Sequence, residues 1–498
     1  MATRADVRLK TADRAFFGHP RGLATLFMTE LWERFSYYGM RALLILFMTA
    51  PQQAGGLGFD VAKAGAVYGL FTAMVYLLSL PGGWVADRWL GQRRAVLYGG
   101  VIIAAGNYLL ATPSLTAFYF GLALVACGTG LLKPNVSVMV GQLYERGDSR
   151  RDAGFSIFYM GINLGAFLAP LACGYLGQRV NWHLGFALAG TGMLAGLAQY
   201  VAGGRHLGEA GKWPAGAGSV AETLAHRRKT LKILAGSLVF VGGLALADAA
   251  GLVQITAQGL SDALGVVLAA SVVAFFVWAL FLGDWERQER RRLAVIGLLF
   301  LASTVFWALF EQAGSTLNLF AERNTNKTVW GFTFPASWFQ SLNALLIVAL
   351  APVFAWLWVR LGSREPSSAA KFAWGLAAAG LGFAVLALGA SVAQRGVQVS
   401  PLWLVGVYVL HTVGELCLSP VGLSAMTKLA PARISSLVMG VWFLSISVGN
   451  YLGARVAMLY ERLSLSELFG VVAGVGLGAG MVMAVLAAPI RKLMGDVK

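Results

Sequence analysis

Long apolar runs, each of about twenty residues, recur along the 498-residue chain and are separated by short polar segments. A run of that length can cross the roughly 30 Å hydrocarbon core of a bilayer as a helix. The pattern predicts spans near 23–48, 63–85, 95–112, 115–140, 154–176, 184–203, 233–251, 264–283, 293–312, 336–359, 372–392, 401–425, 437–458 and 467–489. This makes about fourteen helices, an even number that places both ends of the chain on one side of a membrane.

The longest polar interruption, 203–232, is rich in glycine and follows the first six predicted spans. Two spans with few charges come next, and six more complete the chain. This order predicts an all-α polytopic membrane protein with an N-terminal six-helix half (1–203), a cytoplasmic linker and inserted two-helix hairpin (204–290) and a C-terminal six-helix half (291–498). Transporters built from repeated halves share this organisation. The symmetry is inferred from hydropathy, because the two halves show no clear sequence repeat.

Composition supports the membrane interpretation. Hydrophobic residues make up 57% of the chain and charged residues 12%, about half the charged fraction of soluble domains. The net charge of +16 could suggest nucleic-acid binding, but the basic residues are unevenly placed: 29 of the 39 lie in loops on one side of the predicted topology and 6 on the other. This bias follows the positive-inside rule and predicts cytoplasmic termini. We therefore expect no nucleic-acid partner. The three cysteines lie in apolar spans without metal-ligand spacing, so we expect no metal site.

The first span carries a polar stripe within TELWERFSYYGMR. Its members recur at helical spacing over an arc of roughly 140° and a length of about 16 Å; they are Glu30, Glu33, Arg34, Tyr37, Tyr38 and Arg41. A charge at mid-bilayer costs about 3 kcal/mol or more, so each is a functional hypothesis. The structural alternative is an ion-pair ladder built on Glu30 and Arg34. That ladder leaves Glu33 unpaired and does not explain the tyrosines.

Three further charges lie inside predicted spans: Lys133 in GTGLLKPNVS, Glu311 in FWALFEQAGS and Glu415 in HTVGELCLSP. Together with the charges of the stripe, these residues make four carboxylates and three cations. The cations are Arg34, Arg41 and Lys133. A buried acid whose cation is shared can gain or lose a proton as its contacts change, which is the requirement for proton coupling. The cations Arg41 and Lys133 lie in the N-terminal half, and Glu311 and Glu415 in the other. A central cavity between such halves is dipolar and suits a zwitterion.

Polar and aromatic residues at helical spacing extend this predicted site. They are Tyr159 and Asn163, Trp307 with Glu311, and Tyr76, Asn343 and Trp442. For each one taken alone, a packing role is the alternative, because asparagine often ties membrane helices together and aromatic rings fill their interfaces.

Several longer motifs point to one family. GGWVADRWLGQRR, with Asp87 and Arg88 between two glycines, resembles a loop signature of the major facilitator superfamily. Within that superfamily the chain resembles the proton-dependent oligopeptide transporter family, bacterial type, from residue 16 to about 455. The motifs that carry the resemblance are FFGHPRGLATLFMTELWERFSYYGMRALL, FSIFYMGINLGAF, GTGLLKPN, FWALFEQAGS, QSLNALLIVALAP, GELCLSPVGLS and GVWFLSISVGN. The inserted hairpin also resembles bacterial members.

The resemblance implies the major facilitator fold and proton-driven uptake of di- and tripeptides by alternating access. It implies that Glu30, Glu33 and Arg34 form the proton-coupling group with Lys133, and that Glu311 pairs with Arg41 in an outer gate. It also implies substrate contacts: Arg41, Lys133 and Tyr38 at the peptide carboxylate, Asn163, Asn343 and Glu415 at the amino end, and Tyr76, Trp307 and Trp442 around the side chains. The histidine of mammalian members near the end of the second helix has no counterpart here, so coupling must rest on the carboxylates.

From these patterns we expect a multi-pass protein of the bacterial inner membrane. Its partners would be peptide, protons and the lipid bilayer, with no obligate protein partner and no cofactor beyond the proton gradient. The nearest alternative is a carrier of the same fold for another zwitterion or anion, such as an amino acid or nitrate. An intramembrane enzyme is not favoured, because neither a nucleophile–base pair nor a metal cluster accompanies the carboxylates.

Overall fold

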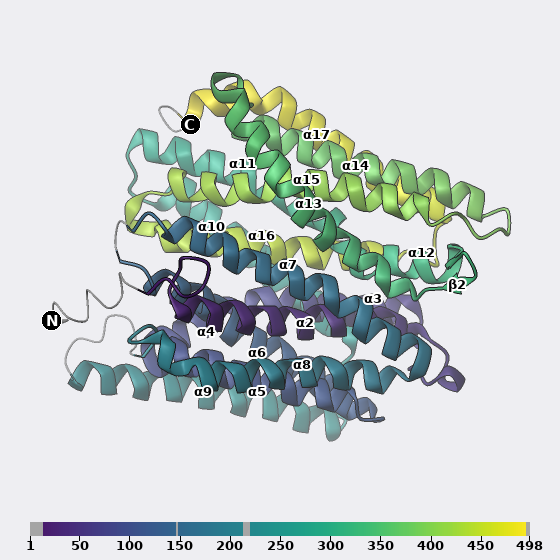
Figure 1. The fold of residues 1–498 in the computed structure, drawn as a ribbon, viewed down its shortest axis with the longest axis horizontal. Helices are drawn as coiled ribbons and strands as arrows, with labels where there is room; N and C mark the ends of the chain where they lie inside the picture. Colours follow the sequence, from purple (N-terminus) through teal and green to yellow (C-terminus); the bar gives the residue numbers. More distant parts are fainter. Residues whose placement is uncertain (1–12, 146–147, 213–219, 495–498) are drawn as a thin grey trace. The chain divides into compact units, whose positions relative to one another are not determined.

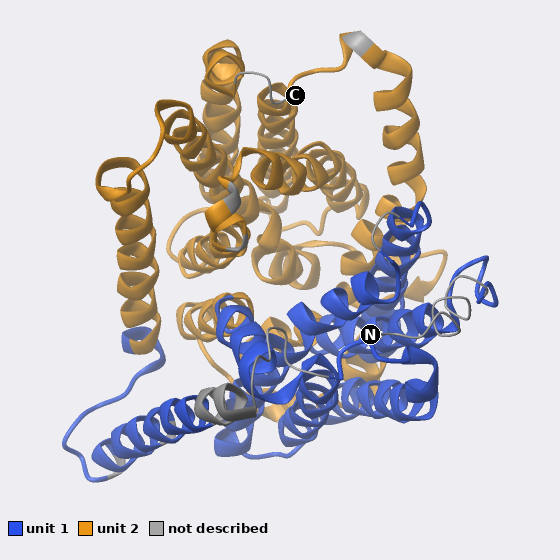
Figure 2. Cartoon of the chain, turned by 90° about the vertical axis from the view of Figure 1, so that its left-hand side faces the viewer, with its two compact units in different colours: residues 1–40, 77–173, 183–259 blue, residues 41–76, 174–182, 260–498 orange. Residues whose placement is uncertain are grey.

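The computed structural model describes residues 13–145, 148–212 and 220–494, and these residues are mostly helical (Figure 1). They form two compact units, which are described separately (Figure 2). Unit 1 comprises residues 1–40, 77–173 and 183–259, and unit 2 comprises residues 41–76, 174–182 and 260–498. Helix α2, Arg21–Thr49, and helix α7, Arg151–Tyr175, each have residues in both units; α3, α8 and α10 cross the boundary by one to three residues and are given below with the unit that holds most of each.

The other helices of unit 1 are α4 (Ser79–Val85), α5 (Gln92–Leu110), α6 (Leu115–Gln142), α8 (Trp182–Gly203) and α9 (Val220–Ala249). Unit 2 holds α3 (Val61–Leu77), α10 (Ala257–Val277), α11 (Arg287–Phe310), α12 (Thr316–Asn324), α13 (Ser341–Leu361), α14 (Ser368–Ala393), α15 (Leu402–Leu429), α16 (Ser435–Ala457) and α17 (Leu465–Met494). Several helix starts are capped by side chains as their sequences dictate. The hydroxyl of Ser114 accepts from the Ala117 N–H before α6, and that of Ser367 accepts from Ala370 before α14.

The predicted number of helices is confirmed. Twelve helical stretches within the described residues are long and apolar enough to cross a membrane. Two further long helices, α2 and α5, complete the predicted set of about fourteen. They are less apolar because α2 contains five charged residues and α5 begins with Gln92, Arg93 and Arg94.

Two of the helical spans predicted from hydropathy are interrupted in the structure. The span predicted near 63–85 is interrupted between α3 and α4. The span predicted near 293–312 leaves its α-helix at Phe310 and continues as a 3-10 turn, Glu311–Gly314, followed by α12. Hydropathy averages over a window, so it does not detect a change of helix type that keeps the residues apolar.

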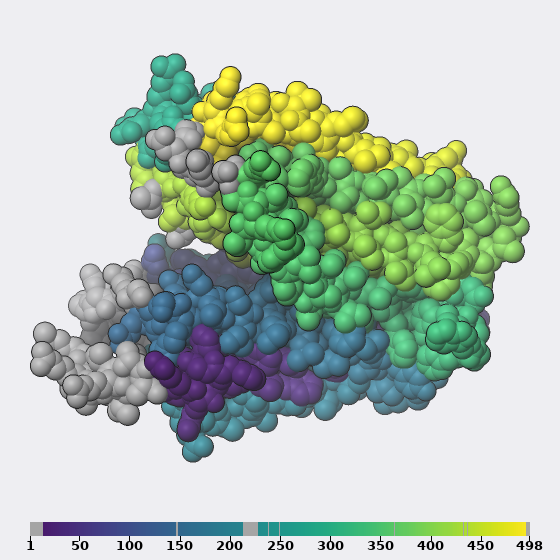
Figure 3. Space-filling model, turned by 45° about the horizontal axis from the view of Figure 1, so that its top comes forward, coloured from purple at the N-terminus to yellow at the C-terminus, as the bar shows by residue number. Residues whose placement is uncertain are grey.

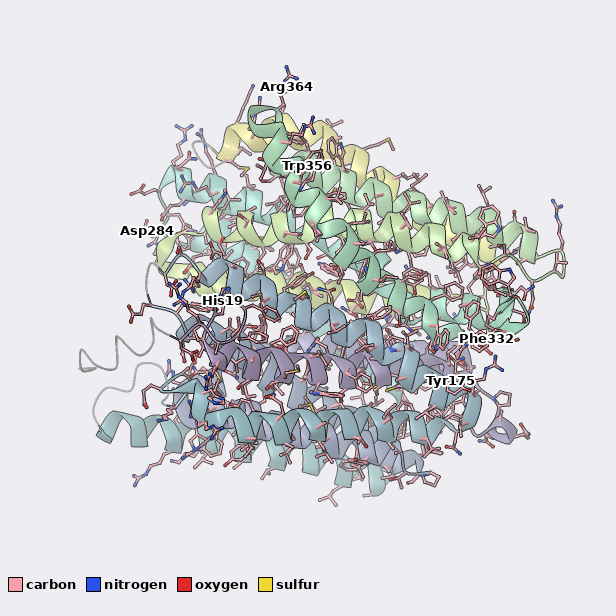
Figure 4. All side chains as sticks on the ribbon, viewed as in Figure 1. His19, Tyr175, Asp284, Phe332, Trp356 and Arg364 are labelled. Carbon is pink, nitrogen blue, oxygen red and sulfur yellow. The ribbon has the colours of Figure 1, made fainter. Side chains whose placement is uncertain are left out.

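A small hairpin between α12 and α13 was also missed. Strand β1, Thr328–Val329, pairs with β2, Phe332–Thr333, across a two-residue turn in which Trp330 and Gly331 both have positive φ. Such a turn suits the twist of a two-stranded ribbon. Figure 4 shows Phe332 on this hairpin at one end of the helices of unit 2 and Asp284, between α10 and α11, at the other end. Loops expected on opposite sides of the membrane thus lie at opposite ends of unit 2.

The compact units do not coincide with the predicted halves, because residues 41–76 and 174–182 group with the C-terminal helices. The predicted division at 1–203, 204–290 and 291–498 concerns a repeated six-helix arrangement, which grouping by contact does not test. It therefore stays a prediction.

Glycines allow close helix contact in unit 1. A Cβ built on Gly99 of α5 would lie 2.8 Å from the carbonyl oxygen of Gly128 of α6, and one on Gly128 would lie 2.6 Å from the Gly99 carbonyl. Gly106 of α5 and Gly121 of α6 repeat this reciprocal contact further along the same two helices. Small residues bring membrane helices into backbone contact and so increase the van der Waals attraction between them. This attraction matters in a bilayer, because the hydrophobic effect does not drive helices together there.

The same contact occurs in unit 2. A Cβ on Gly375 of α14 would lie 2.9 Å from the carbonyl of Gly414 of α15, and the reciprocal distance is 2.7 Å. Helix α17 packs along α14, where Gly380 meets Gly476. Figure 3 shows the yellow atoms of α17 beside green atoms of unit 2. The two units therefore use one packing device that a search for sequence repeats does not reveal, because it requires only single glycines at matching positions.

The adjacent glycines of GGWVADRWLG provide a test of this packing. A Cβ on Gly82 would lie 2.1 Å from the Gly130 carbonyl oxygen, whereas the nearest atom to a Cβ on Gly83 is 4.0 Å away. We expect Gly82→Ala to lower the midpoint of thermal unfolding of the detergent-purified protein by about 2–6 °C, because α4 must move away from α6. Gly83→Ala is the matched control and should shift it by less than about 1 °C. Equal shifts for both variants would contradict the close α4–α6 contact.

Candidate functional site

The charged stripe of α2 begins as a buried acid–base cluster in unit 1. The Arg34 guanidinium contacts both neighbouring carboxylates: its Nε lies 3.3 Å from Glu30 Oε1 and donates a hydrogen bond to Glu33 Oε2. All three residues are at most 3% exposed. The argument that an ion-pair ladder leaves Glu33 unpaired is therefore wrong. Adjacent helix residues point in different directions, but the long arginine side chain folds back and reaches both acids.

Part of this cluster lacks hydrogen-bond partners among the described residues: Glu30 Oε2, Glu33 Oε1 and Arg34 Nη2. A buried carboxylate oxygen without a donor is costly. It becomes a donor itself when the acid is protonated, so the cluster has places where a proton can be accommodated. Lys133 of α6 acts electrostatically on Glu30, and its role in proton coupling stays a prediction.

The remaining predicted residues of unit 1 differ in their contacts and burial. Tyr38 is partly buried, and its ring centroid lies 5.9 Å from Arg34 Cζ. Asn163 of α7 is 5% exposed and donates to the Tyr159 carbonyl within its own helix, 3.0 Å away. Tyr159 is 46% exposed. The contact between these two is thus a backbone contact of one helix turn, and their predicted roles toward a substrate are not tested by it.

Arg41, at the end of the stripe, belongs to unit 2 and is paired there with Glu311. The Arg41 Nη2 atom lies 2.7 Å from Glu311 Oε2, and both side chains are 7% exposed. Glu311 is the first residue of the 3-10 turn that follows α11, and the break in the helix presents its carboxylate to α2. The pairing implied by the family resemblance is present. Arg41 Nε also donates to the hydroxyl of Tyr68 of α3 at 2.9 Å.

A second acidic group of unit 2 is centred on Glu415 of α15. Asn343 of α13 donates through Nδ2 to Glu415 Oε2 at 2.9 Å and to the hydroxyl of Thr412 at 3.1 Å. Two residues predicted for the amino end of a substrate are thus in direct contact. Glu311 acts electrostatically on Glu415, so these two acids belong to one charged region.

The predicted aromatic residues of unit 2 are held by neighbouring glycines. Trp442 is 3% exposed, and its ring edge lies where a Cβ on Gly422 would come within 2.3 Å. Trp307 is 7% exposed, is packed against Gly449, and its indole N–H has no hydrogen-bond partner in the described part of the chain. Tyr76 is partly buried. The unsatisfied indole N–H is a donor available to a ligand.

Sequence reasoning missed Tyr68 and Thr412. Tyr68 lies eight residues before the predicted Tyr76 on α3, so its position on a similar face of the helix could have suggested it. Thr412 gives no such signal, since a threonine in an apolar helix most often bonds its own backbone, as Thr412 also does toward Tyr408. Within 13–145, 148–212 and 220–494, no group of histidine, cysteine and acidic residues has the arrangement of a metal site.

The carboxylates and cations of this arrangement can bind protons and charged groups. Comparison with known proteins shows which family shares these features. The family model described as the POT family matches residues 93–472, more than half of the chain.

The chain belongs to the POT family.

Relatives with curated names and solved structures extend this result. A di-/tripeptide transporter of Lactococcus lactis subsp. cremoris is 40% identical over 98% of this chain and 99% of its own. A crystal structure of a peptide transporter POT in complex with sulfate is 43% identical, covers 99% of this chain and 100% of its own, and has a TM-score of 0.92. A POT family transporter solved with a thioalcohol-conjugated peptide is 34% identical, covers 97% and 99%, and has a TM-score of 0.90. The chain is thus a multi-pass membrane transporter with the fold of this family.

Proposed function

We propose that this chain takes up di- and tripeptides together with protons, by alternating access of a central site. The observation that carries the proposal is two pairs of charged or polar side chains in unit 2: buried Arg41 with Glu311, and partly buried Glu415 with Asn343. They supply a cation for a carboxylate and an acid for an ammonium group, the two charges that every unmodified peptide bears. Relatives named as di-/tripeptide transporters support this substrate class.

The ion pair between Arg41 and Glu311 gives a route from proton binding to substrate binding. Protonation of Glu311 removes its charge and leaves the Arg41 guanidinium with an uncompensated positive charge in a buried place. Breaking a buried pair in this way costs about 3–5 kcal/mol. A peptide carboxylate that binds Arg41 recovers part of that cost, so protonated carrier and peptide favour each other. Reciprocity of binding free energies then couples proton and peptide.

The acid cluster of α2 supplies the second proton-coupling group in this proposal. Glu30 and Glu33 share the single guanidinium of Arg34, with Lys133 acting on Glu30. The two acids compete for one guanidinium, and a proton on either acid removes that competition. Tyr38, Tyr76, Tyr159, Asn163, Trp307 and Trp442 are proposed to complete the substrate site, around the peptide carboxylate, amino end and side chains.

We place the protein in the bacterial inner membrane with both termini in the cytoplasm, on the strength of the basic residues on that side. The membrane potential then drives uptake. Each inward charge contributes about 2.3 kcal/mol per 100 mV, which supports more than tenfold accumulation at one proton per peptide. No cofactor, metal or enzymatic step is part of the proposal.

Uptake by proteoliposomes containing the purified protein tests it. With the lumen at pH about 8 and the outside at about 6, we expect labelled dialanine to accumulate more than tenfold, and a protonophore to abolish this. Unlabelled tripeptides should compete, whereas single amino acids and nitrate should not. Competition by an amino acid or nitrate alone would favour the alternative carrier function. Equilibration without accumulation would exclude proton coupling.

A further inference from the structure

Four elements of unit 2 meet at the Arg41 guanidinium, and one of their contacts has no place in the mechanism described so far. The elements are α2, α3, the 3-10 turn after α11, and α15. Glu311 pairs with Arg41 Nη2, and the hydroxyl of Tyr68 accepts a hydrogen bond from Arg41 Nε, at a different nitrogen. Tyr68 is 1% exposed and lies in the middle of α3. The guanidinium is thus held at two points by two chemically different groups.

We propose that Tyr68 is a positioning residue of the transport cycle, whose hydroxyl keeps Arg41 in place while Glu311 carries a proton. The two contacts respond differently to protonation. The contact with Glu311 depends on the charge of the carboxylate, whereas a phenol accepts a hydrogen bond in its neutral form throughout the range of neutral and acidic pH. The proposal rests on the proposed function, because it assigns Tyr68 to the step in which Arg41 is transferred from Glu311 to a peptide carboxylate.

The close approach of Tyr68 is built into the sequence at Gly314. A Cβ on this residue would lie 1.9 Å from the Tyr68 hydroxyl oxygen and 2.9 Å from Arg41 Nε. No side chain larger than hydrogen fits there without moving the tyrosine, and the φ angle of Gly314 is not one that itself requires glycine. Sterics therefore explain the glycine of FEQAGS: it leaves room for the Tyr68 hydroxyl, which is hydrogen-bonded to Arg41.

Helix α3 is anchored so that the hydroxyl position is well determined. A Cβ on Gly69, the residue after Tyr68, would lie 2.2 Å from the Cβ of Ala454, so α3 and α16 are in contact one residue away. The Thr72 hydroxyl donates to the Tyr68 carbonyl at 2.9 Å. Two titratable groups of α15 also act on this site: Tyr408 interacts electrostatically with Arg41 and Tyr68, and Glu415 with Glu311. A rigid anchor is what a positioning residue needs.

Dipeptide exchange by the full-length protein in liposomes, measured at pH about 5.5 and about 8, tests the proposal. At the acidic pH, which shifts the carrier toward its proton-bearing state, we expect Tyr68→Phe to raise the KM for dialanine about fivefold. This is less than the full effect of losing a hydrogen bond to a charged group, because Tyr68 acts on the peptide only through Arg41. At the alkaline pH the change should be below twofold, and the maximal rate should stay within about twofold at both. In a Glu311→Gln background, the fivefold effect should appear at both pH values.

Gly314→Ala provides an independent variant. Its added methyl group collides with the Tyr68 hydroxyl, so we expect it to reproduce the Tyr68→Phe profile, and the double variant to be no worse than either single one. Tyr460→Phe is the matched control: this phenol is 4% exposed and bonds Asn324 Oδ1 at 3.2 Å, so its loss should not produce a pH-dependent KM. A Tyr68→Phe effect of equal size at both pH values, or no effect in folded protein, overturns the proposal.

A measurement without transport separates this proposal from the proposed function. In detergent, we expect Tyr68→Phe to lower the thermal unfolding midpoint more in the Glu311→Gln background than in the wild type, because the two contacts share one guanidinium. If wild-type protein failed to take up peptides, the proposed function would be wrong, while this cycle would still report whether Tyr68 holds Arg41. Equal effects of Tyr68→Phe in the two backgrounds would show that it does not.

Discussion

Liposomes containing the Glu33→Gln variant are expected to lose proton-driven accumulation of dialanine, from more than tenfold in the wild type to about onefold. Exchange of peptide across the membrane should continue at a rate within about threefold of wild type. The reason lies in the cluster on α2, where Glu33 contacts Arg34 and is fully buried. Glutamine has nearly the same shape and still accepts from Arg34, but it cannot take up a proton. Radiolabel uptake with an imposed pH gradient, and counterflow without one, measure the two quantities.

An exposed acid supplies the control for this variant. Glu209 forms an ion pair with Lys212, and its side chain is 69% exposed, so Glu209→Gln should accumulate dialanine as wild type does. Thermal unfolding of each purified variant checks that the protein is folded. If Glu33→Gln still concentrated the peptide under a pH gradient, Glu33 would not be a coupling group, and Glu30 or Glu311 would have to carry that role.

The second large effect is expected at Glu415. Replacing it by glutamine should raise the KM for dialanine by about 10–100-fold, because a charge-assisted hydrogen bond to the peptide ammonium contributes about 1.5–3 kcal/mol. Binding of N-acetyl-dialanine, which lacks the ammonium charge, should change by less than about threefold. Inhibition constants of both compounds against labelled dialanine exchange measure the difference.

The test compares two compounds, dialanine and N-acetyl-dialanine, in two proteins, the wild type and the Glu415→Gln variant. Loss of affinity for dialanine alone places the ammonium group at Glu415, while equal losses for both compounds would indicate that the variant only disturbs packing around Asn343 and Thr412. Glu467→Gln serves as the protein control, since Glu467 caps the start of α17 through Ser464 outside the charged region. It should leave both inhibition constants unchanged.

The positions of the charged groups were predictable from the sequence, but several of their contacts were not. A buried charge stands out in an apolar span whatever its partner. An ion-pair ladder on Glu30 and Arg34 was taken to leave Glu33 unpaired, because helix geometry separates neighbouring residues, yet Arg34 reaches it. Tyr68 looked like an ordinary aromatic residue of an apolar helix, and its hydrogen bond depends on a glycine 246 residues away in the sequence.

The sequence by itself determined the membrane class, the number of helices and the residues that bear buried charge. These follow from local properties: the length of apolar runs, their spacing and the cost of placing charge in lipid. Only the tertiary structure decided where α11 gives way to the 3-10 turn at Glu311, and that Arg41 is held there by Glu311 and Tyr68 together. Those contacts join helices far apart in the chain through flexible side chains. Their geometry is set by the close packing of small residues such as Gly314, and no local pattern records it.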